Sequence, residues 1–135
     1  TKQGIKINIL GEISKLPSDL KKTLIKCENL TRTNKNINVN LAINYGAKNE
    51  ILMAVKKSKK ISLKNLEKNL YTKKMPNPDI LIRTGGNQRL SNFMLWQMAY
   101  TELFFLKKLW PDLKSIDLKN IIKKFKRIKR NYGAI

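Results

Sequence analysis

The chain has 135 residues, 41% of them hydrophobic, and its 29 basic and 9 acidic residues give a formal net charge of +20. This length and apolar content predict one globular domain. Because the chain has no histidine and one cysteine, Cys27, an intrachain disulfide, a zinc finger and a Ser-His catalytic arrangement are excluded. No uninterrupted run of 18 apolar residues occurs, so no membrane-spanning helix is expected, and the lone cysteine suits a cytoplasmic protein.

The first half of the chain alternates between strand and helix patterns. Residues 5–10 and 37–43 alternate apolar and polar side chains, which predicts two strands. Helical spacing predicts helices over residues 17–32, 48–57 and 63–70. The side chains expected to face inward on these helices are Leu20, Leu24, Cys27, Leu30, Ile51, Leu52, Val55, Leu63, Leu66 and Leu70.

The second half predicts two more strands and two more helices. Strands are expected over residues 79–83 and 102–105, a helix after Ser91, and a turn over residues 110–112. A last helix is expected from near Asp117. Its apolar face comprises Leu118, Ile121, Ile122, Phe125 and Ile128, and its other face is basic. This order predicts an α/β fold, with a mostly parallel sheet and helices on both faces.

One short loop stands out for its arginines. Only five of the 29 basic residues are arginines, and two of them, Arg83 and Arg89, flank a Gly-Gly pair, with Ser91 just beyond. Arg83 ends a predicted strand, where parallel sheets bind ligands. Arginine offers paired donors to phosphate oxygens, and glycine lets backbone N–H groups approach them. The loop therefore indicates a diphosphate site, and the alternative is a Gly-Gly turn that carries surface arginines.

A longer ordered pattern surrounds this loop. Its parts are Asp79-Ile-Leu-Ile-Arg-Thr-Gly-Gly86, Arg89-Leu-Ser-Asn-Phe93, Leu95-Trp-Gln97, Ala99-Tyr100, Glu102-Leu103 and Leu109-Trp-Pro-Asp112, with Ile9-Leu-Gly11 and Asn44-Tyr-Gly46 upstream. The pattern resembles the C-terminal signature of the cis-prenyltransferase family, and the resemblance covers essentially the whole chain. It implies that isopentenyl diphosphate is condensed with an allylic diphosphate, farnesyl diphosphate, to make undecaprenyl diphosphate, the precursor of a cell-wall lipid carrier.

The resemblance also implies roles for individual residues. By it, Arg83, Arg89, Leu90 and Ser91 bind isopentenyl diphosphate, and Glu102 is a ligand of Mg²⁺. A cation that keeps several of its waters needs only one or two protein carboxylates. The alternative for Glu102 is a surface side chain paired with a neighbouring lysine, which contributes little.

A part of the family pattern is missing from the chain. Family members carry an Asp-Gly-Asn-x-Arg segment that binds the allylic diphosphate and supplies the catalytic aspartate, and no such motif occurs here. Residues 1–135 are therefore expected to be the C-terminal portion of a single domain, with no catalytic residue and no activity alone. The family further implies a homodimer and peripheral association with a membrane. Residues 131–133 match its terminal Arg-x-Gly element, except that Asn131 replaces the arginine.

Two other functions compete with this interpretation. A basic nucleic-acid-binding module would gather lysines and aromatic side chains on one face, whereas the aromatic residues here cluster in an apolar stretch. A non-catalytic subunit of a two-component prenyltransferase would tend to lose the phosphate-binding residues. Because Arg83, Arg89, Ser91 and Glu102 are all present, the sequence favours the prenyltransferase and no nucleic-acid partner is expected.

Overall fold

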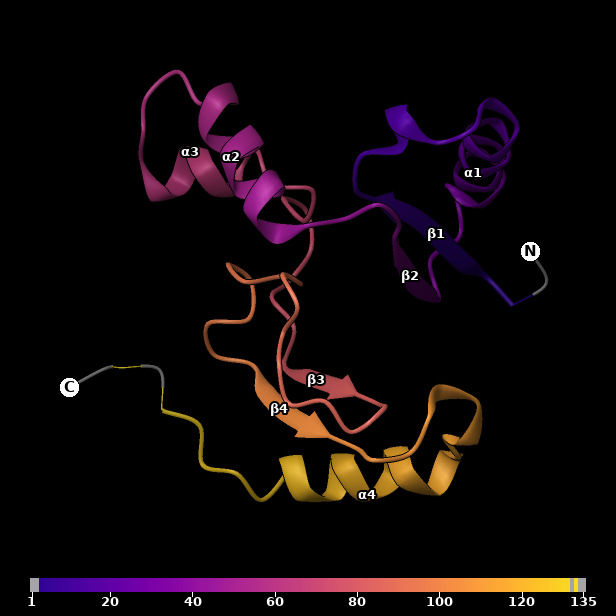
Figure 1. Ribbon diagram of the computed structural model, residues 1–135, viewed down its shortest axis with the longest axis vertical. Helices are drawn as coiled ribbons and strands as arrows, with labels where there is room; N and C mark the ends of the chain where they lie inside the picture. Colours follow the sequence, from indigo (N-terminus) through magenta and orange to yellow (C-terminus); the bar gives the residue numbers. More distant parts are fainter. Residues whose placement is uncertain (1–2, 132, 134–135) are drawn as a thin grey trace. The chain divides into compact units, whose positions relative to one another are not determined.

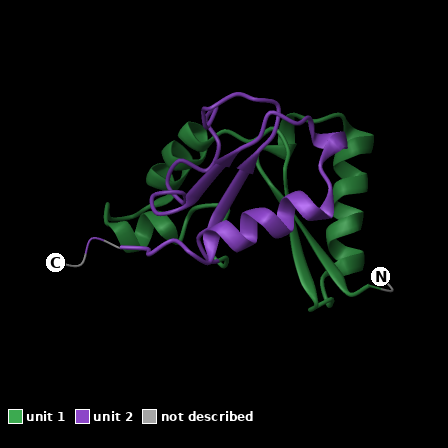
Figure 2. Cartoon of the chain, turned by 90° about the horizontal axis from the view of Figure 1, so that it is seen from below, with its two compact units in different colours: residues 1–75 green, residues 76–135 purple. Residues whose placement is uncertain are grey.

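The computed structural model describes residues 3–131 and residue 133, and both of its strand pairs are parallel (Figure 1). Residues 1–75 and 76–135 form two compact units, which Figure 2 colours separately. The first unit contains β1 (Ile5–Leu10), the 3₁₀ helix η1 (Ile13–Lys15), α1 (Ser18–Thr31), β2 (Ile37–Ala42), α2 (Ala47–Lys57) and α3 (Leu63–Glu67). The second contains β3 (Ile80–Arg83), β4 (Glu102–Phe105), the 3₁₀ helix η2 (Trp110–Asp112) and α4 (Ser115–Phe125).

These elements confirm the α/β class and the parallel direction of the paired strands. In the described part of the chain, the strands form two separate two-stranded sheets, β1 with β2 and β3 with β4. The expectation of one larger sheet with helices on both faces stays a prediction, as does the expectation of a single domain.

The β1–β2 pair carries an aliphatic face. Its register runs from Ile5 opposite Ile37 to Leu10 opposite Ala42. Because side chains alternate along a strand, the isoleucines of β1 share one face with Ile37, Val39 and Leu41. On β2 this face is open, since Ile37 is 57% exposed. The alternation that predicted both strands therefore also identifies their apolar side.

Helix α1 occupies the free edge of β1. The N–H of Ile7 donates to Thr31 Oγ1 at 3.0 Å, and the N–H of Ile9 donates to Glu28 Oε1 at 2.7 Å. Both acceptors come from the last turn of α1. An edge strand whose backbone donors are already bonded is a poor template for another strand, so α1 closes this edge.

Some side chains expected to face inward are exposed instead. In α2, the small residues Ala47 and Ala54 are buried together with Glu50, whereas Leu52 is 52% exposed. Burial of the Glu50 carboxylate, which accepts two hydrogen bonds, turns the leucine outward. In the first unit, the other helix residues that were expected to face inward and that the structure exposes are Leu20, Leu30 and Leu63.

The expected helix after Ser91 was wrong, because residues 91–100 form a series of turns. Ser91, Asn92 and Met94 have φ angles of 49°, 61° and 45°. These left-handed conformations interrupt a right-handed helix. The strand expected at residues 102–105 is confirmed as β4, which pairs with β3 so that Ile80 faces Glu102 and Arg83 faces Phe105.

Helix α4 runs alongside the β3–β4 pair (Figure 1) and buries a narrower stripe than expected. Ile121 is buried, whereas Leu118 and Ile122 are 39% and 47% exposed. The helix ends at Phe125, so Ile128 lies beyond it.

No helix among the described residues is both long and apolar enough to cross a membrane.

Candidate functional site

Arg83 is the last residue of β3, and its side chain folds over the loop that follows. Its Nη1 donates to the carbonyl oxygen of Arg89 and, at 3.0 Å, to Ser91 Oγ. Apolar residues precede Arg83 in the strand and anchor its backbone. The structure thus brings together Arg83, Arg89 and Ser91, which the sequence had singled out.

These residues line a pocket of about 340 Å³ at the carboxyl end of β3. Its walls are Leu81, Ile82, Arg83, Thr84, Arg89, Leu90, Ser91 and Phe93. Arg83 and Leu90 are partly buried, whereas Arg89 and Ser91 are exposed. The pocket therefore combines cationic and hydroxyl groups with an apolar wall to which Leu90 contributes.

Gly85 and Gly86 make the turn after β3 without offering donors to a ligand. Their φ angles of 86° and 76° favour glycine. The N–H of Gly85 donates to the carbonyl of Lys108 at 2.8 Å, and that of Gly86 donates to the carbonyl of Leu106 at 2.9 Å. These two N–H groups fasten the loop to the segment after β4. That other backbone N–H groups of this loop approach phosphate oxygens stays a prediction.

Backbone strain gathers beside the pocket. Ser91, Asn92 and Met94 are three of the four non-glycine residues with positive φ in the described part of the chain. A left-handed conformation costs an L-residue about 1–2 kcal/mol. Such strain persists where the surroundings over-determine the backbone, and it clusters at functional sites. The strained segment supports a functional role for the pocket that it borders.

Glu102 lies apart from this pocket. It is the first residue of β4 and faces Ile80, at the start of β3, whereas Arg83 faces Phe105. Three residues at about 3.3 Å each separate the two positions by about 10 Å along the strands. Since side chains alternate between faces, Glu102 and Arg83 also emerge on opposite sides of the pair. The structure does not bring the expected metal ligand to the expected diphosphate pocket.

Glu102 lines a second pocket of about 250 Å³ together with Ala99, Tyr100, Thr101, Lys129, Arg130 and Asn131. Among the described residues, no group of three or more metal-binding side chains occurs. The pocket also contains Lys129 and Arg130, so its single carboxylate would hold Mg²⁺ only together with a diphosphate, because Mg²⁺ takes most of its ligands from phosphate oxygens and water.

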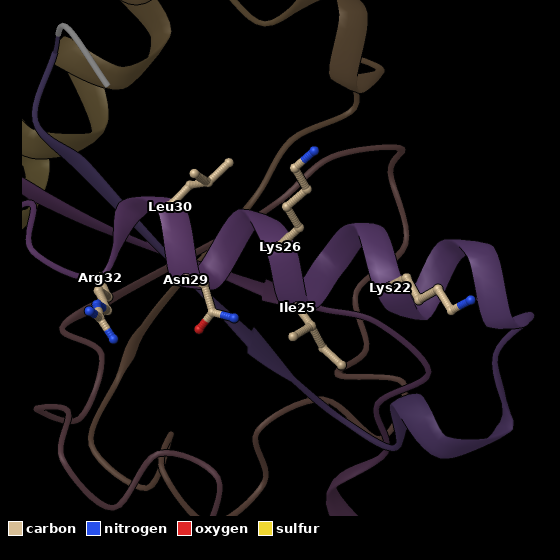
Figure 3. A pocket seen from close by; sticks show the side chains of 6 residues that line it. All are labelled: Lys22, Ile25, Lys26, Asn29, Leu30 and Arg32. Carbon is tan, nitrogen blue, oxygen red and sulfur yellow. The ribbon is translucent and has the colours of Figure 1, made fainter.

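A third hollow, of about 540 Å³, lies on the outer side of α1 (Figure 3). Its lining residues are Lys22, Ile25, Lys26, Asn29, Leu30 and Arg32. All six come from α1 or the residue after it, so no second element converges on the hollow. It has no aromatic side chain, and it does not provide the mixed basic and aromatic face expected of a nucleic-acid-binding module.

Comparison with known proteins identifies the family. A family model described as "Putative undecaprenyl diphosphate synthase" matches residues 1–133. The chain is 42% identical to a tritrans,polycis-undecaprenyl-diphosphate synthase (geranylgeranyl-diphosphate specific) of Picrophilus torridus, over 98% of the chain and 56% of that relative. The chain belongs to the cis-prenyltransferase family. Such prenyltransferases act in isoprenoid biosynthesis on allylic diphosphates and isopentenyl diphosphate, and they typically depend on Mg²⁺.

Solved cis-prenyltransferase structures share the fold. A probable undecaprenyl diphosphate synthase from Campylobacter jejuni matches with a TM-score of 0.89 and 34% identity, over 98% of this chain and 65% of that one. Lavandulyl diphosphate synthase from Lavandula x intermedia, in complex with dimethylallyl diphosphate, matches with a TM-score of 0.91 and 33% identity, over 99% and 62%. The chain spans about half the length of the curated relatives it matches, and its assignment to their C-terminal portion stays a prediction.

Sequence reasoning missed a buried carboxylate in this cis-prenyltransferase chain. Glu50 is 2% exposed. Its Oε2 accepts from the Tyr45 hydroxyl at 2.5 Å, and its Oε1 accepts from the N–H of Tyr71 at 2.8 Å. Burial, followed by the charges of Glu12 and Glu50, raises the pKa of Tyr71. Glu50 thereby ties α2 to the turn after β2 and to the segment after α3. The one sequence signal that could have drawn attention to Glu50 is the rarity of acidic residues, of which the chain has 9.

Proposed function

We propose that this chain is part of a cis-prenyltransferase and that the pocket at Arg83 binds the diphosphate of isopentenyl diphosphate. The observation that carries the proposal is the convergence of Arg83, Arg89 and Ser91 on one pocket with an apolar wall. The ligand has the same two parts, a dianionic or trianionic head and a short hydrocarbon. The arginine side chains supply forked donors to the head, and Leu90 and its apolar neighbours contact the hydrocarbon.

In this reaction, the proposed role of the chain is to bind and orient isopentenyl diphosphate. In the condensation, the allylic carbon–oxygen bond breaks and its electrons leave with the diphosphate. The alkene of isopentenyl diphosphate forms the new carbon–carbon bond, and a proton is then lost from the same molecule. The residues around Arg83 neutralise and orient the attacking molecule, which lowers the entropic part of the barrier. The group that assists departure of the allylic diphosphate is not assigned to this chain.

Glu102 is proposed as the Mg²⁺ ligand, for a diphosphate other than the one held at Arg83. The distance along β3 and β4 and the opposite faces of the two residues support this separation. By the family resemblance, the segment that binds the allylic diphosphate also supplies an aspartate, and we propose that this aspartate shares the metal ion with Glu102. When bound, Mg²⁺ would neutralise charge on that diphosphate, and Glu102 would supply one oxygen ligand.

The finer identity is also a proposal. Undecaprenyl diphosphate as the product is proposed from the similarity to undecaprenyl diphosphate synthases. Farnesyl diphosphate as the allylic substrate is proposed from the sequence resemblance alone, since the relative from Picrophilus torridus is named as specific for geranylgeranyl diphosphate. Relatives with other named products occur at similar identity, such as a chloroplastic nerylneryl diphosphate synthase of Solanum lycopersicum at 40%. We further propose a cytoplasmic homodimer with peripheral membrane contact, one sheet with helices on both faces in the complete fold, and no turnover by the 135-residue chain alone.

Isothermal titration of the protein in its natural full length tests the proposed pocket. Isopentenyl diphosphate and inorganic diphosphate should bind, and orthophosphate should bind far more weakly. Arg89→Lys should weaken both diphosphates, because a point charge replaces a fork. Arg127→Lys, which makes the same exchange in the C-terminal segment, is the matched control. Equal affinities for wild type and Arg89→Lys would overturn the role of Arg89.

A further inference from the structure

The side chain of Arg130 makes three contacts that the sequence did not predict. Its Nη1 lies 2.5 Å from Asp79 Oδ1, and its Nη2 donates to the carbonyl of Tyr100 at 3.0 Å. Its guanidinium carbon lies 5.4 Å from the centre of the Phe125 ring. The side chain is only 19% exposed. One guanidinium thus holds together the residue before β3, a residue shortly before β4 and the end of α4.

We propose that Arg130 is a positioning residue for Glu102, and that it acts by clamping residues 127–131 against the starts of β3 and β4. The inference rests on the proposed function in so far as Glu102 is a metal ligand there. It concerns a different residue and a different contact set from the pocket at Arg83.

The clamp reaches Glu102 through two backbone segments. The N–H of Glu102 donates to the carbonyl of Asp79 at 3.0 Å. Just before it, Thr101 Oγ1 donates to the carbonyl of Pro78 at 2.7 Å. Arg130 bonds the Asp79 side chain on one segment and the Tyr100 carbonyl on the other. The two segments that set the position of Glu102 are therefore held in register by one side chain.

The segment that Arg130 holds in place also forms part of the pocket that Glu102 lines. Lys129, Arg130 and Asn131 form its wall opposite residues 99–102. Lys129 and Arg130 both place positive charge in this wall, which opposes a metal ion beside Glu102. The Asp79 carboxylate compensates the charge of Arg130, and a bound diphosphate would compensate that of Lys129. Asp79 is 66% exposed, so the ion pair alone contributes little. The combination of ion pair, carbonyl contact and ring contact is what requires arginine.

The test uses the protein in its natural full length, with Mn²⁺ as the probe and electron paramagnetic resonance to measure free Mn²⁺ in the presence of inorganic diphosphate. Arg130→Gln should weaken Mn²⁺ binding about tenfold or more, as loss of a residue that orients a ligand does. The Mn²⁺ affinity of Arg130→Lys should lie between those of wild type and Arg130→Gln, and the Mn²⁺ affinity of Arg127→Lys should match that of wild type. Hydrogen exchange at the Glu102 amide should quicken in Arg130→Gln while core amides of β1 are unchanged.

The outcomes separate this inference from the proposed function. If Glu102→Gln weakens Mn²⁺ binding and Arg130→Gln does not, the positioning role is overturned and the metal role of Glu102 stands. If Glu102→Gln leaves Mn²⁺ binding unchanged, the metal role fails and the positioning role fails with it. Titration of isopentenyl diphosphate at the Arg83 pocket then still reports on the proposed function independently. Should Arg130→Gln fail to fold, Arg130→Lys is the variant to measure: it should weaken Mn²⁺ binding by less than tenfold, and wild-type affinity in that variant would overturn the positioning role.

Discussion

Ser91 combines two properties at a single residue. Its hydroxyl accepts from Arg83, and its backbone has a φ of 49°. The hydrogen bond fixes the guanidinium at the mouth of the pocket, and the backbone conformation is one that glycine adopts without strain. Function and stability should therefore respond differently to substitution here.

A pair of substitutions at Ser91 separates these effects. Ser91→Ala and Ser91→Gly both remove the hydroxyl, so both should weaken isopentenyl diphosphate binding to a similar extent. Ser91→Gly should be more stable than Ser91→Ala by about 1 kcal/mol, because the left-handed conformation strains alanine. Denaturant unfolding and titration calorimetry measure the two quantities. Equal stability of the two variants would show that the backbone at Ser91 is not strained.

The sequence predicted individual residues best where arginine was rare. Arg83 and Arg89 were singled out because five arginines stand among 29 basic residues, and the structure places them in one pocket. The same signal was available for Arg130, but no pattern linked it to Asp79, which lies 51 positions away. The use of the Gly85 and Gly86 N–H groups was also beyond prediction, because their acceptors follow a strand that comes later in the chain.

At the scale of elements, Asp117 connects α4 to the segment after β4. Its Oδ1 accepts from Lys108 Nζ at 2.7 Å, and its Oδ2 accepts from the N–H of Lys114, at the start of α4, at 2.9 Å. The hydrogen bond from Lys108 and then that from Lys114 lower the pKa of Asp117 below its ordinary 3.8. The charged form of Asp117 is therefore the one that stabilises the fold.

This lowered pKa predicts a pH-dependent effect of Asp117→Asn. The stabilisation is present above the ordinary value of 3.8 and is lost as the pH falls through the lower pKa of the folded state. Asp117→Asn should thus lower the Tm at neutral pH and have little effect in strong acid. Thermal unfolding of both proteins across this range measures the difference. A Tm difference that does not change with pH would contradict the assigned role of the carboxylate.

The sequence pattern predicted whether a segment is a helix or a strand far better than it predicted which of its sides is buried. Strands β1 to β4 and helices α1, α2 and α4 lie close to where periodicity placed them. Residues 91–100 were mistaken for a helix because apolar composition does not reveal positive φ angles. Leu52 was expected inward because leucine is usually buried, whereas the hydrogen bonds of Glu50 orient α2.

At the scale of the whole molecule, a net charge of +20 does not by itself identify a partner. Most lysines are spread over the surface, and the charge that converges with apolar walls at a strand end is that of Arg83 and Arg89. The proposed diphosphate pocket would account for arginine at these two positions in a lysine-rich chain. The feature that points to a diphosphate ligand is therefore the pocket rather than the overall charge.

The most direct test measures incorporation of radiolabelled isopentenyl diphosphate into polyprenyl product by the protein in its natural full length, with Mg²⁺ and farnesyl diphosphate. Wild type should give product. Arg83→Lys should raise the KM for isopentenyl diphosphate about tenfold, the cost of losing one charge-assisted hydrogen bond. The KM for farnesyl diphosphate and the behaviour of Arg127→Lys should stay near wild type. An unchanged KM for isopentenyl diphosphate in Arg83→Lys, or no incorporation by wild type, would contradict the account.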